Sequence, residues 1–459
     1  MNILSIEYAV VLFCLFVLGS VFGSMLNVCI YRLPREERFW QALRYMVYPP
    51  SHCPRCRQPI RWHDNIPILS WLILRGRCRN CRGMISVRYP LVELLTGLLF
   101  ALVYWFEIPD WWGPVVEQSA VYHELGPTGF AGSTWMSPLA MLHWRYTVHL
   151  ALVIALVVAT FIDIDLRIIP DAVTLPAMAV ALLASWLLGQ VYIMPLWYQT
   201  PAMKSWAVQY GVMLQQLIPP ALIPAWFAPG PALGVPAWIT AHPHLHGLCF
   251  SLAGIVVGGG IIWAVRIVGH WALKREAMGF GDVVLMAMIG SFLGWQGTLI
   301  VFFLSLIAAV AVAIPVWLIW RDHELPYGPY LSVGALVLLL SGRHIWPGFD
   351  TRIFAMGPML LPVALFMTAL LGAMLVVWRG IKQALGFAPG EVANYEEGWR
   401  PGDQLAYLAG ECGDDRQGQW PTCEWPGRLS GRGQGHVQVW RCSDCCRPNG
   451  AWHRSPRLL

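Results

Sequence analysis

The fold class is most evident in residues 149–189, HLALVIALVVATFIDIDLRIIPDAVTLPAMAVALLASWLLG. It holds two long apolar runs, separated by a short segment with three aspartates and a proline. A helix needs about 20 predominantly apolar residues to cross a bilayer, and the residue before a proline is driven out of the helical region. The stretch therefore predicts two membrane-spanning helices joined by a short polar connection.

The rest of the chain has the same character. Of its 459 residues, 57% are hydrophobic and only 12% are charged, and the mean hydropathy is +0.53. These values lie outside the range of ordinary soluble domains. We therefore expect an all-α polytopic membrane protein with about eight or nine transmembrane helices. The predicted spans lie near 6–30, 91–106, 147–162, 172–192, 247–268, 283–295, 298–320, 329–342 and 357–378.

The first apolar run resembles a secretory signal at first sight. It lacks a basic segment before it and a small-residue cleavage site after it, and a strongly basic segment follows. We therefore interpret residues 1–30 as a first transmembrane helix that is retained as an anchor.

Basic residues predict the orientation. The segment 31–90 holds twelve arginines against three acids, so it is expected on the cytoplasmic side. The poorly basic loops 107–146 and 193–246 then fall on the outer side, as parts of a membrane core that spans 91–378. The segment 379–459 is predicted to be a cytoplasmic tail, partly disordered.

Ionisable residues at membrane helices are costly and tend to mark working sites. Alternation of the spans places Asp163 and Asp282 at the same cytoplasmic face. Asp165 and Asp171 fit solvated or capping acids at a helix boundary, with Asp171 placed to cap the next helix.

Asp282 follows two glycines in the sequence GFGD. One interpretation is a flexible loop that ends in an N-cap aspartate. The other is that Gly279 and Gly281 leave room for an extended peptide beside the acid. Two carboxyls that lie close together share a proton and titrate as a pair, which is the chemistry of peptide hydrolysis by an aspartate dyad.

Four cysteines in the predicted cytoplasmic loop have the spacing C-x2-C-x21-C-x2-C. They are Cys53, Cys56, Cys78 and Cys81. This spacing is typical of zinc ribbons, and four thiolates close the coordination sphere of the ion. Disulfides are rare in a reducing cytosol. The pattern predicts a structural Zn²⁺ site whose loss unfolds the loop.

Two further groups of possible ligands are less regular. The C-terminal tail holds Cys412, Cys423, Cys442, Cys445 and Cys446, and its composition favours a loosely folded appendage over a second zinc site. The histidines of HPHLH, residues 242–246, are interpreted as surface residues beside the membrane interface rather than as metal ligands.

Seven motifs in order resemble the type IV prepilin peptidases, the bacterial members of the GxGD aspartyl intramembrane proteases. They are GSMLNVCIYRLP (23–34), SHCPRC (51–56), CRNC (78–81), VRYPLVELLTG (87–97), IDIDLRIIPD (162–171), GFGDVVLMAMIG (279–290) and LPYGPYLSVGAL (325–336). The resemblance implies that Asp163 and Asp282 are the catalytic pair, with Asp165 as an alternative to Asp163. The outer loops are longer than the family pattern leads us to expect, and the last span with its tail is additional to that pattern.

The resemblance also implies the substrates and the location. Prepilins or pseudopilins would lose a basic leader at the cytoplasmic face of the bacterial inner membrane, and no nucleic acid partner is expected. Family members with the tetracysteine loop commonly methylate the new amino terminus with S-adenosylmethionine. Glu93 is either structural, paired with loop arginines, or part of that second activity, and we favour the structural role.

Three alternatives to a bifunctional enzyme follow from the same features. The first is a peptidase without methyltransferase activity. The second is a transporter whose aspartates carry protons or cations, and the third is a membrane scaffold for pilus or secretion assembly. The transporter predicts inverted repeats, and none is visible in the sequence. Neither the transporter nor the scaffold accounts for both the tetracysteine loop and the aspartates.

Overall fold

The computed structural model describes residues 6–35, 44, 51–53, 56, 58–108, 138–189, 191–197, 201–223, 227, 236–273, 278–320 and 326–384. These residues form helices and loops. They contain two isolated β-bridges but no extended β-strand. The long helices are α1 (Ile6–Arg32), α4 (Arg88–Glu107), α7 (Pro138–Leu166), α8 (Asp171–Leu188), α11 (Pro243–Leu273), α12 (Phe280–Trp320), α13 (Gly328–Arg352) and α14 (Leu360–Ala384).

Within the part of the chain that the structure describes, seven helices are long and apolar enough to cross a membrane: α1, α4, α7, α8, α11, α12 and α14. A shorter apolar helix, Gly328–Gly342, forms the first part of α13. The prediction of an all-α polytopic membrane protein is confirmed. The number of spans depends on whether α12 crosses the membrane once or twice.

Glycine 294 divides α12 into two arms. Its φ of 70° and ψ of 176° are not helical. Residues 286 and 298 would lie about 18 Å apart along a straight helix, but a Cβ added to Gly258 would meet Met286 O at 2.5 Å and Thr298 Cγ2 at 3.1 Å. The chain therefore turns back at Gly294. The two predicted spans 283–295 and 298–320 correspond to these arms.

The helices α1 and α4 pack closely along antiparallel paths. A Cβ on Gly23 would lie 2.6 Å from Glu93 Cα, and a Cβ on Gly19 would lie 2.9 Å from Gly97 Cα. Further along, the Asn27 Nδ2 amide donates to Tyr89 O at 3.1 Å. Small residues let two backbones approach in a membrane, where helix packing replaces the hydrophobic effect as the driving force.

The connection between α7 and α8 places the aspartates of the opening stretch. Arg167 has a positive φ of 55°, and its N–H donates to Asp163 O at 2.8 Å, which ends α7. Pro170 takes the N-cap position of α8 without a side-chain cap. The prediction that Asp171 caps this helix is wrong, because Asp171 is already the first helical residue.

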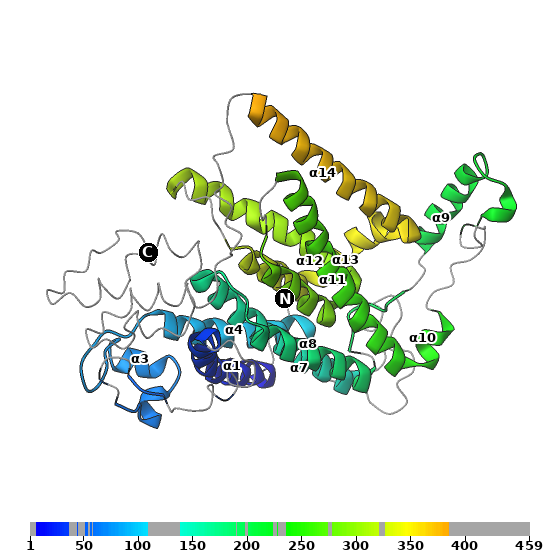
Figure 1. Ribbon diagram of the computed structural model, residues 1–459. Coiled ribbons are helices and arrows are strands. Elements are labelled where there is room, and N and C mark those ends of the chain that lie inside the picture. Colours follow the sequence, from blue (N-terminus) through cyan, green and yellow to red (C-terminus); the bar gives the residue numbers. More distant parts are fainter. Residues whose placement is uncertain are drawn as a thin grey trace.

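The tetracysteine loop and the helices of the segment 193–246 lie at opposite ends of the molecule. In Figure 1 the blue loop with α3 (Leu69–Ile73) lies beside one end of α1 and α4, while α9 (Pro201–Leu214) and α10 (Ala237–Ala241) lie at the far side. The helix α7 begins at Pro138, inside the segment that was expected to be an outer loop. The C-terminal tail and its five cysteines lie outside the described residues.

Two assignments from sequence are corrected near this far end. Arg145 lies in the segment 107–146 that was expected to be an outer loop, but it is buried in α7, with Nε 3.7 Å from Glu107 Oε2. His246, expected at the surface, is fully buried. Its Nε2 accepts the Leu196 N–H at 2.9 Å, and its ring lies 4.7 Å from that of Tyr192. His246 therefore fastens the segment after α8 to α11.

Candidate active site

Asp163 lies in the last turn of α7 and is only 5% exposed. Its Oδ2 accepts a hydrogen bond from the Gly328 N–H at 3.0 Å. Gly328 begins α13, so this N–H has no partner within its own helix. The positive end of the α13 dipole also faces the carboxylate, which favours a negative charge there.

Gly328 is the residue of this site that the sequence interpretation missed. A Cβ at this position would lie 2.5 Å from Asp163 Oδ2, a distance at which the carboxylate would have to move. The motif LPYGPYLSVGAL was identified from the sequence, but no role was given to the first of its two glycines. The signal that could have found it is a glycine at the start of an apolar helix, directly before a proline.

Asp282 lies in the first turn of α12 and is 8% exposed. Its carboxylate accepts a hydrogen bond from the Gly279 backbone, and it lies close enough to Asp163 for the two charges to interact. The structure thus brings together the two acids that the sequence paired. Each is at the end of an apolar helix and is largely shielded from water.

Ile169 packs between Gly281, next to Asp282, and Gly328, which binds Asp163. A Cβ on Gly281 would meet Ile169 Cβ at 3.1 Å, and a Cβ on Gly328 would meet Ile169 Cδ1 at 3.3 Å. The glycines of GFGD differ in their surroundings, because among the described residues a Cβ on Gly279 would meet no atom closer than Asp282 Oδ2 at 3.8 Å. Gly281 therefore allows close packing, and Gly279 leaves space beside the acid.

Asp165 has a different environment from Asp163. It is exposed and forms an ion pair with Arg88, the first residue of α4. The same guanidinium lies 5.2 Å from the centre of the Phe161 ring and donates to Phe161 O at 3.2 Å. This arrangement gives Asp165 a role in joining α4 to α7. It also puts the start of α4, and so the end of the tetracysteine loop, beside the end of α7.

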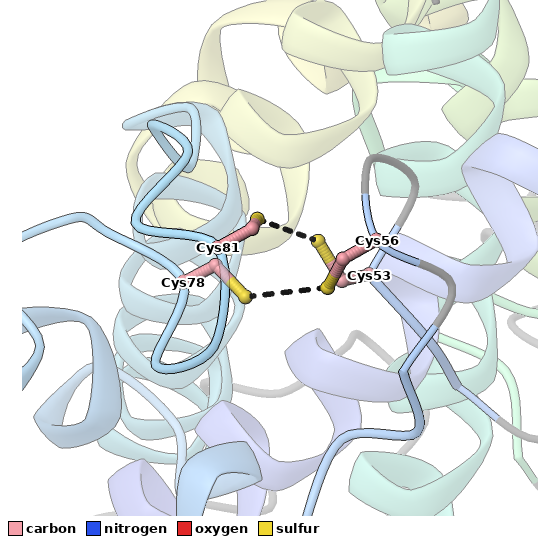
Figure 2. Close-up of side chains that lie close together, drawn as sticks. All are labelled: Cys53, Cys56, Cys78 and Cys81. Carbon is pink, nitrogen blue, oxygen red and sulfur yellow. Dashed lines mark hydrogen bonds between the residues drawn. The ribbon is translucent and has the colours of Figure 1, made fainter. Parts of the chain in front are cut away.

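The four cysteines of the loop converge, as Figure 2 shows. Cys53 Sγ lies 3.9 Å from Cys81 Sγ, and Cys56 Sγ lies 4.0 Å from Cys78 Sγ. All four sulfur atoms lie within 4.8 Å of one another. A tetrahedral site with Zn–S bonds of about 2.3 Å has S–S edges of about 3.8 Å. The geometry and the donor set fit a metal ion of this type.

Local hydrogen bonds shape the two turns that carry the cysteines. The Cys53 N–H donates to Gln58 O at 3.0 Å, and the Cys78 N–H donates to Gly83 O at 2.8 Å. The backbone N–H of Cys81 is the main cause that lowers the pKa of Cys78 to about 7. This thiol therefore loses its proton readily near neutral pH, as a metal ligand must.

Glu93 joins the loop to the membrane helices. Its Oε2 accepts the Ile68 N–H at 2.7 Å, and Ser24 of α1 also hydrogen-bonds this carboxylate. The partners that the structure shows are thus a loop backbone and a hydroxyl, where loop arginines were expected. These contacts are consistent with the structural role that we favour.

Comparison with known proteins agrees with this arrangement. Residues 17–106 match the Bacterial Peptidase A24 N-terminal domain, and residues 213–314 match the Type IV leader peptidase family. The prepilin leader peptidase/N-methyltransferase of Aeromonas salmonicida is 32% identical over 355 residues, which cover 72% of this chain and 90% of the relative. The chain belongs to the type IV leader peptidase family.

Other members of the type IV leader peptidase family show the same extent of similarity. The Type 4 prepilin-like proteins leader peptide-processing enzyme of Escherichia coli O78:H11 is 30% identical, over 70% of this chain and 90% of the relative. A prepilin leader peptidase/N-methyltransferase of Pseudomonas aeruginosa is 27% identical, over 72% and 91%. No solved structure gives a significant match.

The two matched regions cover most of the candidate residues. The tetracysteine loop and Glu93 lie within 17–106, and the GFGD segment lies within 213–314. Asp163 and Gly328 lie outside both regions. Their assignment to the site therefore depends on the motif order and on the contacts around Ile169, and the catalytic roles stay predictions.

Proposed function

We propose that this chain is an aspartic endopeptidase of the membrane that removes the basic leader from type IV prepilins and pseudopilins. The observation that carries the proposal is the convergence of Asp163 and Asp282, two buried carboxyls from α7 and α12. The names of the relatives support the choice of substrate, because they describe prepilin leader peptidases. No metal is needed for this type of hydrolysis.

The reaction follows from the proximity of the two acids. Two adjacent carboxyls do not ionise together easily, so the pair holds one proton between them. The ionised member takes a proton from water, which attacks the scissile carbonyl carbon. The protonated member donates its proton to the carbonyl oxygen. Collapse of the tetrahedral intermediate, with proton transfer to the leaving nitrogen, breaks the C–N bond and restores the shared proton.

Gly328 and Gly279 prepare this dyad for the reaction. The Gly328 N–H holds one oxygen of Asp163, which leaves the other oxygen of that carboxyl to bind water. The open space at Gly279 lets an extended substrate strand lie beside Asp282. A helical substrate would hide its amide bonds, so the cleavage site has to be extended.

The dyad and the arginine-rich loop belong to one end of the molecule. The ion pair between Arg88 and Asp165 links the end of the loop to the last turn of α7, where Asp163 lies. An excess of arginine in this loop predicts a cytoplasmic location. We therefore place the active site at the cytoplasmic face of the bacterial inner membrane, where a basic leader remains after insertion of a prepilin.

In the proposed enzyme the four cysteines hold a structural Zn²⁺. The ion would fix the two turns at 53–56 and 78–81 and leave no open coordination position for catalysis. A second activity, methylation of the new amino terminus with S-adenosylmethionine, is proposed from the names of the relatives. Incubation of the purified enzyme with cleaved pilin and a labelled methyl donor tests it, and absence of transfer would leave a peptidase alone.

The peptidase is tested with Asp163→Asn and Asp282→Asn in the purified full-length chain, with Asp165→Asn as the matched control. General acid–base groups typically contribute about 10²- to 10⁴-fold to a rate, so each dyad variant should lose cleavage of a prepilin by at least that lower factor. Asp165→Asn should retain most of the rate. Cleavage at the wild-type rate by both dyad variants, with zinc content unchanged, would refute the assignment.

A further inference from the structure

The segment before the second cysteine pair lies at the depth of the membrane helices. The Ile68 N–H donates to Glu93 Oε2 at 2.7 Å, and Ser24 of α1 bonds the same carboxylate. Both Glu93 and Ser24 belong to helices that are long and apolar enough to cross a membrane. Ile68 is therefore held against these two helices.

The depth follows from helix geometry. With a rise of about 1.5 Å per residue, Glu93 lies about 7.5 Å along α4 from Arg88, its first residue. On α1, Ser24 lies about 12 Å along the axis from Arg32, and the residues between them, MLNVCIY, carry no charge. Ile68 is thus level with apolar turns of both helices, inside their charged ends.

The helix α3 begins directly after Ile68 and exposes apolar side chains. Leu69, Leu72 and Ile73 are 55%, 57% and 72% exposed. Residues three and four positions apart lie on one helix face, so these three side chains form a single apolar surface. Ser70 points the other way and is buried, and its Oγ donates to His63 O at 3.0 Å.

Cationic side chains follow this surface at once. Arg75 and Arg77 come two and four residues after Ile73, and both are exposed. Gly76 has a positive φ of 65°, and the chain turns there toward Cys78. An apolar face bordered by arginine is the pattern of elements that lie in a membrane interface and contact anionic headgroups.

We propose that α3 is an interfacial helix whose apolar face, Leu69, Leu72 and Ile73, inserts into the lipid leaflet on the side of the tetracysteine loop. Arg75 and Arg77 then contact the phosphates of anionic lipids at the same surface. Interfacial helices insert by about 5–10 Å, which agrees with the depth set by Glu93. The lipid surface is the partner, and it seats the tetracysteine loop on the membrane whether or not the chain is a peptidase.

Photo-crosslinking in vesicles tests the contact with lipid. Benzoylphenylalanine is placed at Ile73 in the full-length chain, which is reconstituted in vesicles of phosphatidylcholine mixed with phosphatidylglycerol. The matched control carries the same probe at Asn80, which is exposed in the turn between Cys78 and Cys81. We expect several-fold more adducts with the mass of a phospholipid from position 73 than from position 80.

Two results would overturn the proposal. Equal lipid labelling at the two positions would mean that α3 is no deeper than the zinc turn. Loss of the lipid adducts at position 73 in favour of adducts to an added prepilin would assign the surface to the substrate.

A separate experiment tests the arginines. The double variant Arg75→Gln, Arg77→Gln should reduce the preference of the adducts for phosphatidylglycerol over phosphatidylcholine. An unchanged preference would exclude the proposed headgroup contacts.

Discussion

The tetracysteine cluster and the aspartate pair belong to the same end of the molecule, but the chain builds them in different ways. The four cysteines come from one segment, 53–81, and two turns with their own backbone hydrogen bonds present the thiols. The aspartates come from α7 and α12, and a third helix, α13, supplies the N–H that holds Asp163. The cluster should therefore depend on the proposed Zn²⁺ ion, and the dyad on helix packing.

Removal of the metal should have the largest effect, and it should be confined to the loop. Structural Zn²⁺ sites contribute roughly 10–16 kcal/mol in isolated zinc-binding peptides. Cys78→Ser should therefore abolish protection from hydrogen exchange in 51–87 while α7 and α12 stay protected. Cys14→Ser on α1 is the control and should change neither. Loss of protection in both regions would show that the two sites are one folding unit.

Gly328→Ala should have the next largest effect, and it should be confined to the dyad. The new Cβ would lie 2.5 Å from Asp163 Oδ2, so the carboxylate has to move. A displacement of about 1 Å at a reacting group can cost about 10²-fold in rate, and prepilin cleavage measures it. Gly348→Ala in the same helix meets no atom of the described part of the chain within 4 Å and is the control. Wild-type rates for both variants would remove Gly328 from the site.

The two glycines of GFGD should respond unequally to alanine. Gly281→Ala brings a Cβ to 3.1 Å from Ile169 Cβ. In Gly279→Ala the nearest atom of the described residues to the new Cβ is Asp282 Oδ2, at 3.8 Å. Overpacking typically costs about 1–3 kcal/mol, so Gly281→Ala should slow cleavage several-fold and Gly279→Ala much less. Bulky residues at either position should impair cleavage and leave the zinc loop folded. A greater loss for Gly279→Ala would mean that substrate space matters more than packing.

Asp64→Asn should have the smallest effect. A bidentate hydrogen bond from Arg79 is the main cause that lowers the pKa of Asp64. A lowered pKa in the folded loop means that this contribution to stability is present above the unfolded pKa of about 3.9 and is lost as the pH falls through the folded value. Exposed ion pairs contribute little, so hydrogen exchange of the loop should differ slightly at pH 7.

The control for Asp64→Asn is to measure hydrogen exchange of the loop in both proteins over a series of pH values. The other effects of pH on the loop are shared by wild type and Asp64→Asn, so only the difference between the two proteins reports on Asp64. This difference should shrink as the pH falls. A difference that grows toward low pH would contradict the assigned ion pair with Arg79.

Some features of the site were predictable because they are local. The acids Asp163 and Asp282 stand out in apolar runs, and the cysteine spacing specifies two turns. Other features were not, because they depend on which helices meet. Asp163 and Asp165 lie two residues apart in the same run, and the structure separates them, because Asp163 is buried against the Gly328 N–H and Asp165 is exposed and paired with Arg88. Arg145 and His246 lie in segments that were predicted to be outer loops, but helix packing buries both side chains.

The sequence by itself determined that this chain crosses a membrane many times and carries a tetracysteine cluster. Apolar length and ligand spacing are properties of short segments, and no distant residue is needed to interpret them. The tertiary structure was needed to show that Gly328 holds Asp163 and that Ile169 packs against both Gly281 and Gly328. Each of these depends on contacts between segments far apart in the chain, where the identity of one residue says little about its neighbour in space.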